Sequence, residues 1–450
     1  MEIPDKPRWI LERLRSRGFA AYAVGGCVRD TLLGRVPGDW DICTAALPEE
    51  TEAVFSDCRC IETGLKHGTV TVRYDGEPFE ITTFRRDGAY TGHRRPEQVQ
   101  FVSSLQEDLG RRDFTINAMA LDRNGDLQDF FGGQEDLRDG VIRCVGDPDR
   151  RFQEDALRIL RALRFAARLE FSIDPETAGA MLRNRDLLRT ISGERIYKEL
   201  TGMLVGPGVG EVLTRYASVL IPIIPEIAPA MGFDQHSPYH DQDVWGHTIT
   251  AIGHSKPDPW VRWALLLHDL GKPETFTLDH RGVGHFYGHP ERSEAIARDL
   301  FTRLHTDKAS LEAVCSLVRH HDAFAPVERK HVLRWLSRYG QEQFFRLMEV
   351  QKSDTLAHVE SDQSVARFHH IQAFADLGWR LLQEEPCLSR KDLKVNGRDV
   401  MALGVTGPEV GACLDRLLQA VMEGTCPNKR PALLARLSRL CQSGEDTYAD

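Results

Sequence analysis

The chain has 450 residues, 41% of them hydrophobic, and a formal net charge of −10 at pH 7. This length suits two to four domains of a soluble globular protein, and the negative charge argues against wholesale coating of nucleic acid. The longest apolar runs are far too short to span a bilayer, the N-terminus has no secretory hydrophobic region, and the ten cysteines form no Cys-x-x-Cys pair. We therefore expect a cytoplasmic protein with reduced thiols and no membrane contact.

The first 140 residues predict a mixed α/β unit with few strands. Helix-like spacing of Trp9, Ile10, Leu11 and Leu14 comes first. Strands are then expected at Ala21–Val24, Trp40–Cys43, Thr69–Tyr74 and Pro78–Phe84, the last two as a hairpin around Asp75-Gly76.

Beyond residue 140 the pattern becomes helical. Apolar residues from Phe152 to Ala167 recur at helical spacing, prolines and glycines near 205–229 mark breaks, and histidines concentrate between His236 and His358. We therefore expect four domains, at residues 1–140, 141–235, 236–360 and 361–450.

The most informative feature is a glycine turn followed by two acidic residues, Asp39 and Asp41. A turn such as Gly25-Gly26 lets backbone N–H groups approach a triphosphate, and Arg29 adds positive charge. An Asp-x-Asp pair on a strand directs both carboxylates to one face, where they hold Mg²⁺ together with nucleotide phosphates. The pattern favours metal-assisted transfer of a nucleotidyl group.

This segment resembles the first motif of the class II tRNA nucleotidyltransferases, the CCA-adding enzymes of the polymerase-β-like superfamily. Four further motifs of that family follow in order: Arg94-Arg95-Pro96, Arg111–Ala120, Glu154–Arg158 and Gly193–Ile196. One such motif is weak support, but five in order are strong.

The resemblance implies an α+β fold, with a polymerase-β-like head containing a small mixed sheet, and all-helical neck, body and tail regions after it. It implies addition of C, C and A to the 3′ end of tRNA from CTP and ATP without a template, with Mg²⁺ held by the catalytic Asp39 and Asp41. The implied nucleotide-binding residues are Gly26, Arg29, Arg112, Asp155, Arg158, Arg161 and Arg164. Glu80 is either a third carboxylate or an exposed strand residue.

Asp155 and Arg158 are three residues apart, so we expect them on one helical face. A carboxylate accepts a hydrogen bond from the amino group of C or A, and a guanidinium donates to their acceptors. Uracil and guanine present the opposite pattern, and each unpaired buried group costs about 1–3 kcal/mol. The pair therefore predicts selection of C and A by the protein itself.

His247, His268-Asp269 and Asp354 resemble the HD phosphohydrolase pattern, and residues 236–360 are expected to form that domain. Because the pair follows the apolar run Ala264–Leu267, burying it without a partner is expensive, and a shared Mn²⁺, Ni²⁺ or Fe²⁺ ion compensates. His289 and His320-His321 are candidates to complete a binuclear centre. The resemblance implies phosphomonoesters or 2′,3′-cyclic phosphates as substrates. The alternative is a degenerate unit kept for packing or RNA contact.

The tail, from about residue 361, resembles that of some CCA-adding enzymes and is expected to hold tRNA, although a generic helical capping domain is a competitor. Three alternatives within the family stay open: an enzyme that adds only A, only CC, or poly(A). The segment Gly88 to Pro96 resembles the loop of enzymes that add A. The alternative from another class is an HD phosphohydrolase whose head merely binds RNA.

Overall fold

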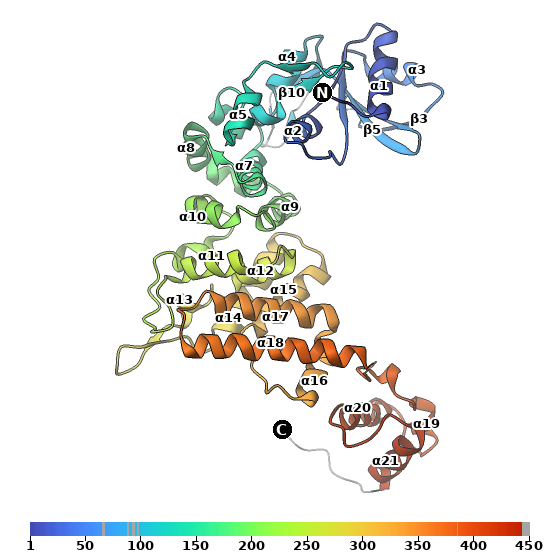
Figure 1. Ribbon diagram of the computed structural model, residues 1–450, viewed down its shortest axis with the longest axis vertical. Coiled ribbons are helices and arrows are strands. Elements are labelled where there is room, and N and C mark those ends of the chain that lie inside the picture. Colours follow the sequence, from blue (N-terminus) through green and yellow to red (C-terminus); the bar gives the residue numbers. More distant parts are fainter. Residues whose placement is uncertain (65–67, 88–89, 92–94, 97–98, 385, 443–450) are drawn as a thin grey trace. The chain divides into compact units, whose positions relative to one another are not determined.

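The computed structural model describes residues 1–450 except 65–67, 88–89, 92–94, 97–98, 385 and 443–450. The chain folds into two compact units (Figure 1). The first comprises Met1–Ala228 with Thr302–Thr306, and the second comprises Pro229–Phe301 with Asp307–Asp450. A seven-stranded sheet lies in the first unit and the second unit is largely helical, which confirms the expected α+β fold.

The sheet occupies the part of the chain before residue 140, called the head below. Its strands lie in the order β11 (Leu127–Asp129), β10 (Met119–Leu121), β1 (Ala21–Val24), β2 (Asp41–Thr44), β5 (Glu77–Thr83), β4 (Thr69–Tyr74) and β3 (Arg59–Gly64). Strands β2 and β5 run parallel, and the other neighbours run antiparallel. The helices of the head are α1 (Asp5–Ser16), α2 (Gly26–Leu32), α3 (Pro48–Val54), α4 (Leu105–Gly110) and α5 (Gly133–Asp139).

The predicted hairpin is confirmed as β4 and β5. Asp75 and Gly76 both have positive φ, 47° and 81°, and the flanking residues Tyr74 and Glu77 pair with each other. Two left-handed residues match the twist of the strands that they join, which is why an Asp-Gly pair favours this turn.

The strand with the acidic pair begins at Asp41, so the expectation that Asp39 shares it is wrong. Strand β1 ends at Val24, the pairing partner of Asp41, and the chain then turns at Gly25. Residues before Asp41 therefore have no partner on β1, and Asp39 lies in the loop that leads into the strand.

The single helix expected from Phe152 to Ala167 is two helices, α6 (Pro148–Glu154) and α7 (Leu157–Leu169). Asp155 between them is extended, with φ −137° and ψ 103°, and its carboxylate accepts the N–H of Leu157 at 3.1 Å. A side chain that accepts a nearby backbone N–H in this way competes with the hydrogen bonds of a helix, and α6 ends before Asp155. The unit continues with α8 (Pro175–Asn184), α9 (Gly193–Leu204) and α10 (Val209–Leu220), and α7 packs against α9 and α10.

In the second unit α17 (Gln341–Leu356) packs against α11 (Val244–His254), α12 (Pro259–Leu267) and α18 (Asp362–Gln383), the layered helices of Figure 1. A short hairpin of β14 (Thr277–Leu278) and β15 (Gly284–His285) follows α13 (Lys272–Thr275). The remaining helices are α14 (His289–Arg303), α15 (Lys308–His320), α16 (Arg329–Tyr339), α19 (Gly397–Met401), α20 (Glu409–Met422) and α21 (Arg430–Gln442).

Among the described residues, no helix is both long enough and apolar enough to cross a membrane. The nine described cysteines are all free. Gly88 and Arg94, which belong to the expected loop motif, lie outside the described residues.

Candidate functional site

The glycine turn and Asp41 are neighbours because of strand pairing. Val24, the last residue of β1, pairs with Asp41, the first residue of β2. Gly25 follows with φ 79° and ψ −129°, a backbone conformation that side chains with a Cβ rarely adopt. Gly26 then begins α2. The turn thus brings the N-terminal N–H groups of a helix close to the acidic residues.

Three carboxylates gather beside this turn. In the parallel pairing of β2 and β5, Ile42 lies opposite Ile81, so Asp41 and Glu80 are neighbours in register. Asp39, Asp41 and Glu80 are all solvent-exposed, yet the protein packed around Asp41 raises the pKa of its carboxyl to about 6. Repulsion from Asp39 and Glu80 adds to this rise, and Arg112 opposes it. An open group of mutually repelling carboxylates suits a divalent cation, which removes the repulsion.

Two arginines flank the glycine turn. A Cβ on Gly25 would lie 3.0 Å from Nη1 of Arg112, so that guanidinium rests against the turn. Arg112 also lies 3.5 Å from the buried Asp108. Arg29 on α2 pairs with Asp30 at 2.8 Å. Arg112 therefore places positive charge beside the carboxylates, and Arg29 places it beside Gly26, where the phosphates of a nucleotide would require it.

Three guanidiniums converge on the ring of Phe165 in α7. Arg29, Arg161 and Arg164 lie 5.1, 5.3 and 4.4 Å from its centre. Arg161 pairs with Asp113 at 2.7 Å, and Arg164 pairs with Glu199 at 2.5 Å. The structure thus brings together residues from α2 and α7 that lie far apart in the sequence.

Asn117 links these residues to the head. Its side-chain oxygen accepts a hydrogen bond from Arg29 at 2.8 Å, and its amide donates to Asp113 at 3.1 Å. Asn117 therefore holds Arg29 and Asp113 in position.

Asp155 and Arg158 do not share a helical face, because the helix is interrupted at Asp155. The Asp155 carboxylate accepts a hydrogen bond from Arg195 at 3.0 Å. The buried Arg158 guanidinium donates instead to Glu154 at 2.9 Å and to the carbonyl oxygen of Arg111 at 2.9 Å. The contact with Arg195, a residue of the fifth motif, was not predicted from the sequence.

A second cluster lies in the second unit. The side chains of His247, His268, Asp269 and Asp354 are buried, and their donor atoms lie within 4.8 Å of one another. Nε2 of His247 is 2.9 Å from Oδ1 of Asp354, and Nε2 of His268 is 3.2 Å from Oδ2 of Asp269. The structure therefore assembles all four residues that the sequence selected, from α11, the end of α12 and α17.

The histidines present their Nε2 atoms to this cluster. Nδ1 of His268 is 2.7 Å from the carbonyl oxygen of Leu265, and Nδ1 of His247 is 3.3 Å from that of Ala357, so both Nδ1 atoms act as donors. Histidines that bind metals commonly hold their second nitrogen in this way. Nε2 of His268 is buried and faces carboxylate oxygens of Asp269 and Asp354, at 3.2 and 3.4 Å. A shared divalent cation fits this set of donors.

A proton is the alternative occupant. Burial alone would lower the pKa of His268, but the carboxylates of Asp269 and Asp354 raise it to about 10. In the absence of a cation, an imidazolium at His268 would then balance part of the buried negative charge. A bound cation would displace this proton, so metal affinity and pH are coupled.

Asp269 also belongs to an adjoining group with His289 and His321. Nε2 of His289 lies 3.1 Å from Nε2 of His321, and 3.4 Å from Oδ1 of Asp269. Nδ1 of each histidine faces a backbone carbonyl, at 2.9 and 2.7 Å. Two imidazole lone pairs that face each other repel unless a cation or a proton lies between them, so this group can hold a second ion beside the first.

The inclusion of His320 in that centre was wrong. Its Nδ1 lies 2.8 Å from the carbonyl oxygen of Ser316, and its Nε2 faces Arg338 at 3.2 Å. The buried side of α15 carries Val314, Leu317 and Val318, and His321 continues that helical phase whereas His320 does not.

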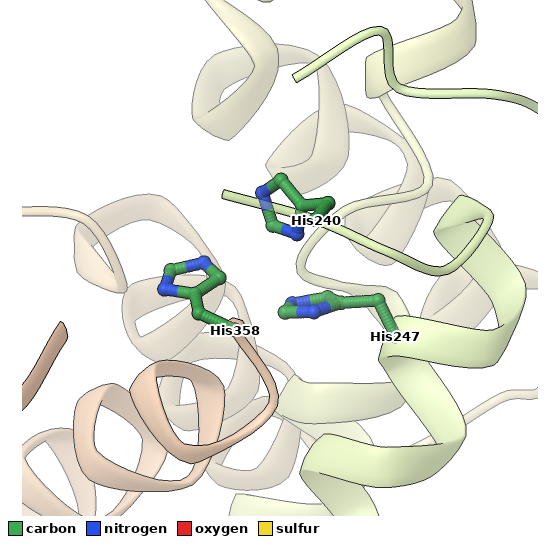
Figure 2. A group of neighbouring side chains, drawn as sticks. All are labelled: His240, His247 and His358. Carbon is green, nitrogen blue, oxygen red and sulfur yellow. The ribbon is translucent and has the colours of Figure 1, made fainter. Parts of the chain in front are cut away.

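Two histidines not selected from the sequence adjoin His247 (Figure 2). The rings of His240 and His358 lie 4.8 and 5.3 Å from the ring of His247, and 4.6 Å from each other. Burial lowers the pKa of His240 to about 2 and that of His358 to about 4. Both are therefore neutral imidazoles near neutral pH, and both line the pocket that opens over the cluster.

Three family descriptions match the chain. Residues 21–143 match the Poly A polymerase head domain, residues 170–231 match the probable RNA and SrmB-binding site of polymerase A, and residues 290–437 match the putative domain 2 of tRNA nucleotidyltransferase.

The chain is similar to curated proteins and solved structures that are named CCA-adding enzymes. The CCA-adding enzyme of Levilactobacillus brevis is 35% identical over 440 residues, which are 96% of this chain and 97% of that protein. The CCA-adding enzyme of Geobacillus thermodenitrificans is 45% identical over 272 residues, 59% of this chain and 63% of that one. The crystal structure of the Bacillus stearothermophilus CCA-adding enzyme in complex with CTP is 30% identical, with a TM-score of 0.71 and 99% of each chain covered.

Proposed function

Since the chain belongs to the family of the CCA-adding enzymes, we propose that it extends the 3′ end of tRNA with C, C and A, using CTP and ATP. The observation that carries this proposal is the group of carboxylates and arginines at the glycine turn, within a fold that matches a CTP-bound relative along almost its whole length. The expected division into a head, a neck and body, an HD domain and a tail is part of this proposal.

Asp39 and Asp41 are proposed to hold Mg²⁺, with Glu80 close enough to join them. Ions held there would supply positive charge to activate the 3′-hydroxyl for in-line attack on the α-phosphate and to stabilise the pyrophosphate that leaves. Arg112 and the turn at Gly25 and Gly26 bind the triphosphate and orient it, because they place a guanidinium and free N–H groups beside the carboxylates. Arg29, Arg161 and Arg164 are proposed to line the rest of the nucleotide site.

Asp155 and Arg158 are proposed to select the base. Arg195 already holds the Asp155 carboxylate, whereas Arg158 is bound to Glu154. Selection through both residues therefore requires Arg158 to exchange Glu154 for the acceptors of C or A. Asp155 lies between α6 and α7, so its carboxylate belongs to neither helix and a base can reach one of its oxygens.

One experiment tests the main activity. Transcripts that end before the first C, before the second C and before A are offered CTP or ATP alone, and the products are sized on a gel. With CTP we expect two C on the transcript that ends before the first C and one C on the transcript that ends before the second. With ATP we expect one A on the transcript that ends before A. Repeated addition of A, or addition of only one nucleotide type, would instead identify a poly(A)-, A- or CC-adding enzyme. Asp39→Asn and Asp41→Asn serve as inactive controls, and extension by either would refute the metal assignment.

A second candidate function is phosphoester hydrolysis at the HD cluster. It is favoured by the buried Nε2 of His268, which faces the carboxylates of Asp269 and Asp354, and by the facing Nε2 atoms of His289 and His321. Asp269 would contribute to both groups of ligands, because its Oδ2 lies toward His268 and its Oδ1 toward His289. Mn²⁺, Ni²⁺ or Fe²⁺ suits this mixture of imidazole and carboxylate.

Hydrolysis of a 2′,3′-cyclic nucleotide with Mn²⁺ or Ni²⁺ tests this second function, and His268→Ala is its control. Product formed by the wild type and lost in His268→Ala is the expected result. No product with any divalent ion would leave the cluster only a structural role.

A further inference from the structure

We propose that Tyr287, stacked on His285, receives the base of the substrate above the HD cluster, so that this centre prefers phosphate esters that carry a nucleobase. The proposal rests on the phosphohydrolase function proposed above and adds a residue that determines its specificity. Tyr287 lies beyond the group of proposed ion-binding side chains, which act on the phosphate and not on what the phosphate is attached to.

The pocket above the cluster is larger than a phosphate requires. Its volume is about 480 Å³, whereas a phosphate occupies the space of only a few waters of roughly 30 Å³ each. This volume falls in the range of pockets that enclose a whole small molecule, about 300–1,000 Å³. Asp269 and Asp354 of the ion cluster lie in its wall, so the pocket opens onto the proposed ions. The remaining volume is therefore available to the part of the substrate beyond the phosphate.

Charge and aromatic groups are both present in this pocket. Lys272 and Arg367 line it and supply positive charge for a phosphate, and Lys272 lies 2.7 Å from Oδ2 of Asp269. His285 and Tyr287 also line it, and their rings are stacked, 5.4 Å apart with 8° between their planes. Cations together with an aromatic face match a ligand that has a charged phosphate and a flat ring.

The aromatic pair is held in place before a ligand arrives. His285 belongs to β15, whose pairing with β14 fixes its backbone, and its Nε2 lies 3.4 Å from Asp279. The Asp279 carboxylate also accepts the N–H groups of Arg281 and Val283 within the hairpin. Tyr287 rests on His285 while 79% of its surface stays exposed, which leaves area for stacking. A surface ordered in advance loses little entropy when it binds.

The chain connects this aromatic pair directly to the ion cluster. Tyr287 is two residues before His289, and all residues from Gly284 to Pro290 line the pocket. Nδ1 of His289 is 2.9 Å from the carbonyl oxygen of Phe286, the residue between His285 and Tyr287. One short segment thus positions both the proposed base platform and a proposed ion ligand, which fixes the distance between the ring and the phosphate of a bound nucleotide.

Steady-state kinetics of the full-length protein with Mn²⁺ test the proposal on two substrates, guanosine 2′-monophosphate and glycerol 2-phosphate. Guanine is chosen because the head is proposed to reject it. We expect the ratio of kcat/KM values, nucleotide over glycerol 2-phosphate, to fall about tenfold in Tyr287→Ala, mainly through KM, and to be retained in Tyr287→Phe. Trp379→Ala removes an exposed aromatic residue outside the pocket and should keep the wild-type ratio. An unchanged ratio in Tyr287→Ala would overturn the proposal.

Equilibrium dialysis of guanosine 2′-monophosphate against the Mn²⁺-loaded protein separates this proposal from the one on which it rests. If the wild type hydrolyses neither substrate, the phosphohydrolase function fails, but a tenfold weaker binding in Tyr287→Ala than in Trp379→Ala would still support the base platform. Equal binding by these two variants would overturn it. Equal losses for both substrates in the kinetic assay would show a structural role for Tyr287 and would also overturn it.

Discussion

Single carboxylates of the first unit differ in how their charge is balanced. Asp41 stands beside Asp39 and Glu80, and its pKa is raised by the surrounding protein, which displaces water, and by repulsion that Arg112 only partly offsets. Burial would also raise the pKa of Asp113, but Arg161 and Asn117 lower it to about 2. The negative charge at Asp41 is therefore still unbalanced and suits a cation, whereas Arg161 already balances the charge of Asp113. We infer that Asp41 takes part in the proposed nucleotidyl transfer and that Asp113 holds Arg161 in place.

The low pKa of Asp113 predicts how stability depends on pH. Because its folded-state pKa is depressed from 3.8 to about 2, Asp113 stabilises the fold above pH 4 by about 2 kcal/mol, and this contribution is lost as the pH falls from about 4 to 2. Asp113→Asn should therefore flatten this part of the stability profile. Urea unfolding between pH 2 and 6 measures it, with the exposed Asp126→Asn as control. Parallel profiles for wild type and Asp113→Asn would contradict the expected coupling.

The substitution Asp155→Asn tests whether this single residue selects the base. The asparagine keeps the shape but can present an N–H₂ group to the amino group of C or A, so one hydrogen bond is lost or replaced by repulsion. We expect kcat/KM for CTP and ATP to fall roughly 5- to 150-fold relative to UTP and GTP. Single-nucleotide extension assays measure the change. Arg195→Met should move it in the same direction, since Arg195 holds the carboxylate, whereas the exposed Arg189→Met should not. Unaltered preference in Asp155→Asn would exclude it from selection.

The residue types at both sites could be predicted, but not all of their positions. Helical periodicity runs across Asp155 without interruption. The hydrogen bond from the N–H of Leu157 to the Asp155 carboxylate, where the helix is interrupted, could not be predicted from it. The exclusion of His320 could have been predicted, because the apolar phase of α15 includes His321 alone. His240 and His358 carry no sequence signal of their own, since it is the tertiary fold that brings them to His247.

Among the elements, the turn between β1 and α2 has the narrowest backbone requirement. Gly25 has φ 79°, and a side chain there would meet Arg112 at 3.0 Å. We expect Gly25→Ala to destabilise the protein by about 1–3 kcal/mol and to raise the KM for CTP, because the backbone is strained and Arg112 is displaced. Thermal unfolding and extension kinetics measure the two effects.

Gly34→Ala is the matched control for that turn. Gly34 also has positive φ, 68°, but a Cβ there would meet nothing within 4 Å. It should therefore lose some stability and keep its KM for CTP. If both variants raised the KM equally, the effect would come from backbone strain in general and not from contact with Arg112.

The strands of the head show what local sequence determines and what it does not. Two adjacent turn residues specify the β4–β5 hairpin, because they alone allow its two left-handed conformations. The order of the sheet depends instead on contacts between distant segments, such as the parallel pair β2 and β5. That pairing places Glu80 beside Asp41, which is why the sequence left its role open. Motif order predicted the components of the site, and long-range pairing decides which of them meet.

For the whole molecule, the two proposed chemistries lie in separately compact units. The carboxylates of the head belong to the unit that includes Met1–Ala228, and the histidine cluster belongs to the unit that begins at Pro229. Each unit buries its own apolar residues, among them Val24, Cys43 and Phe84 in the first and Trp263, Phe301 and Phe344 in the second. A change of charge at one cluster therefore leaves the packing around the other in place.

This separation predicts that the two activities respond independently to mutation and to metal removal. His268→Ala should lose hydrolysis and keep nucleotide addition within about twofold, and Asp39→Asn should do the reverse. After chelation, Mg²⁺ should restore addition but not hydrolysis, because histidine nitrogens favour Mn²⁺ or Ni²⁺ over Mg²⁺. Both activities are measured on the same full-length preparations. Loss of nucleotide addition in a folded His268→Ala protein would mean that the histidine cluster is required for the transferase activity. The two sites would then be functionally coupled.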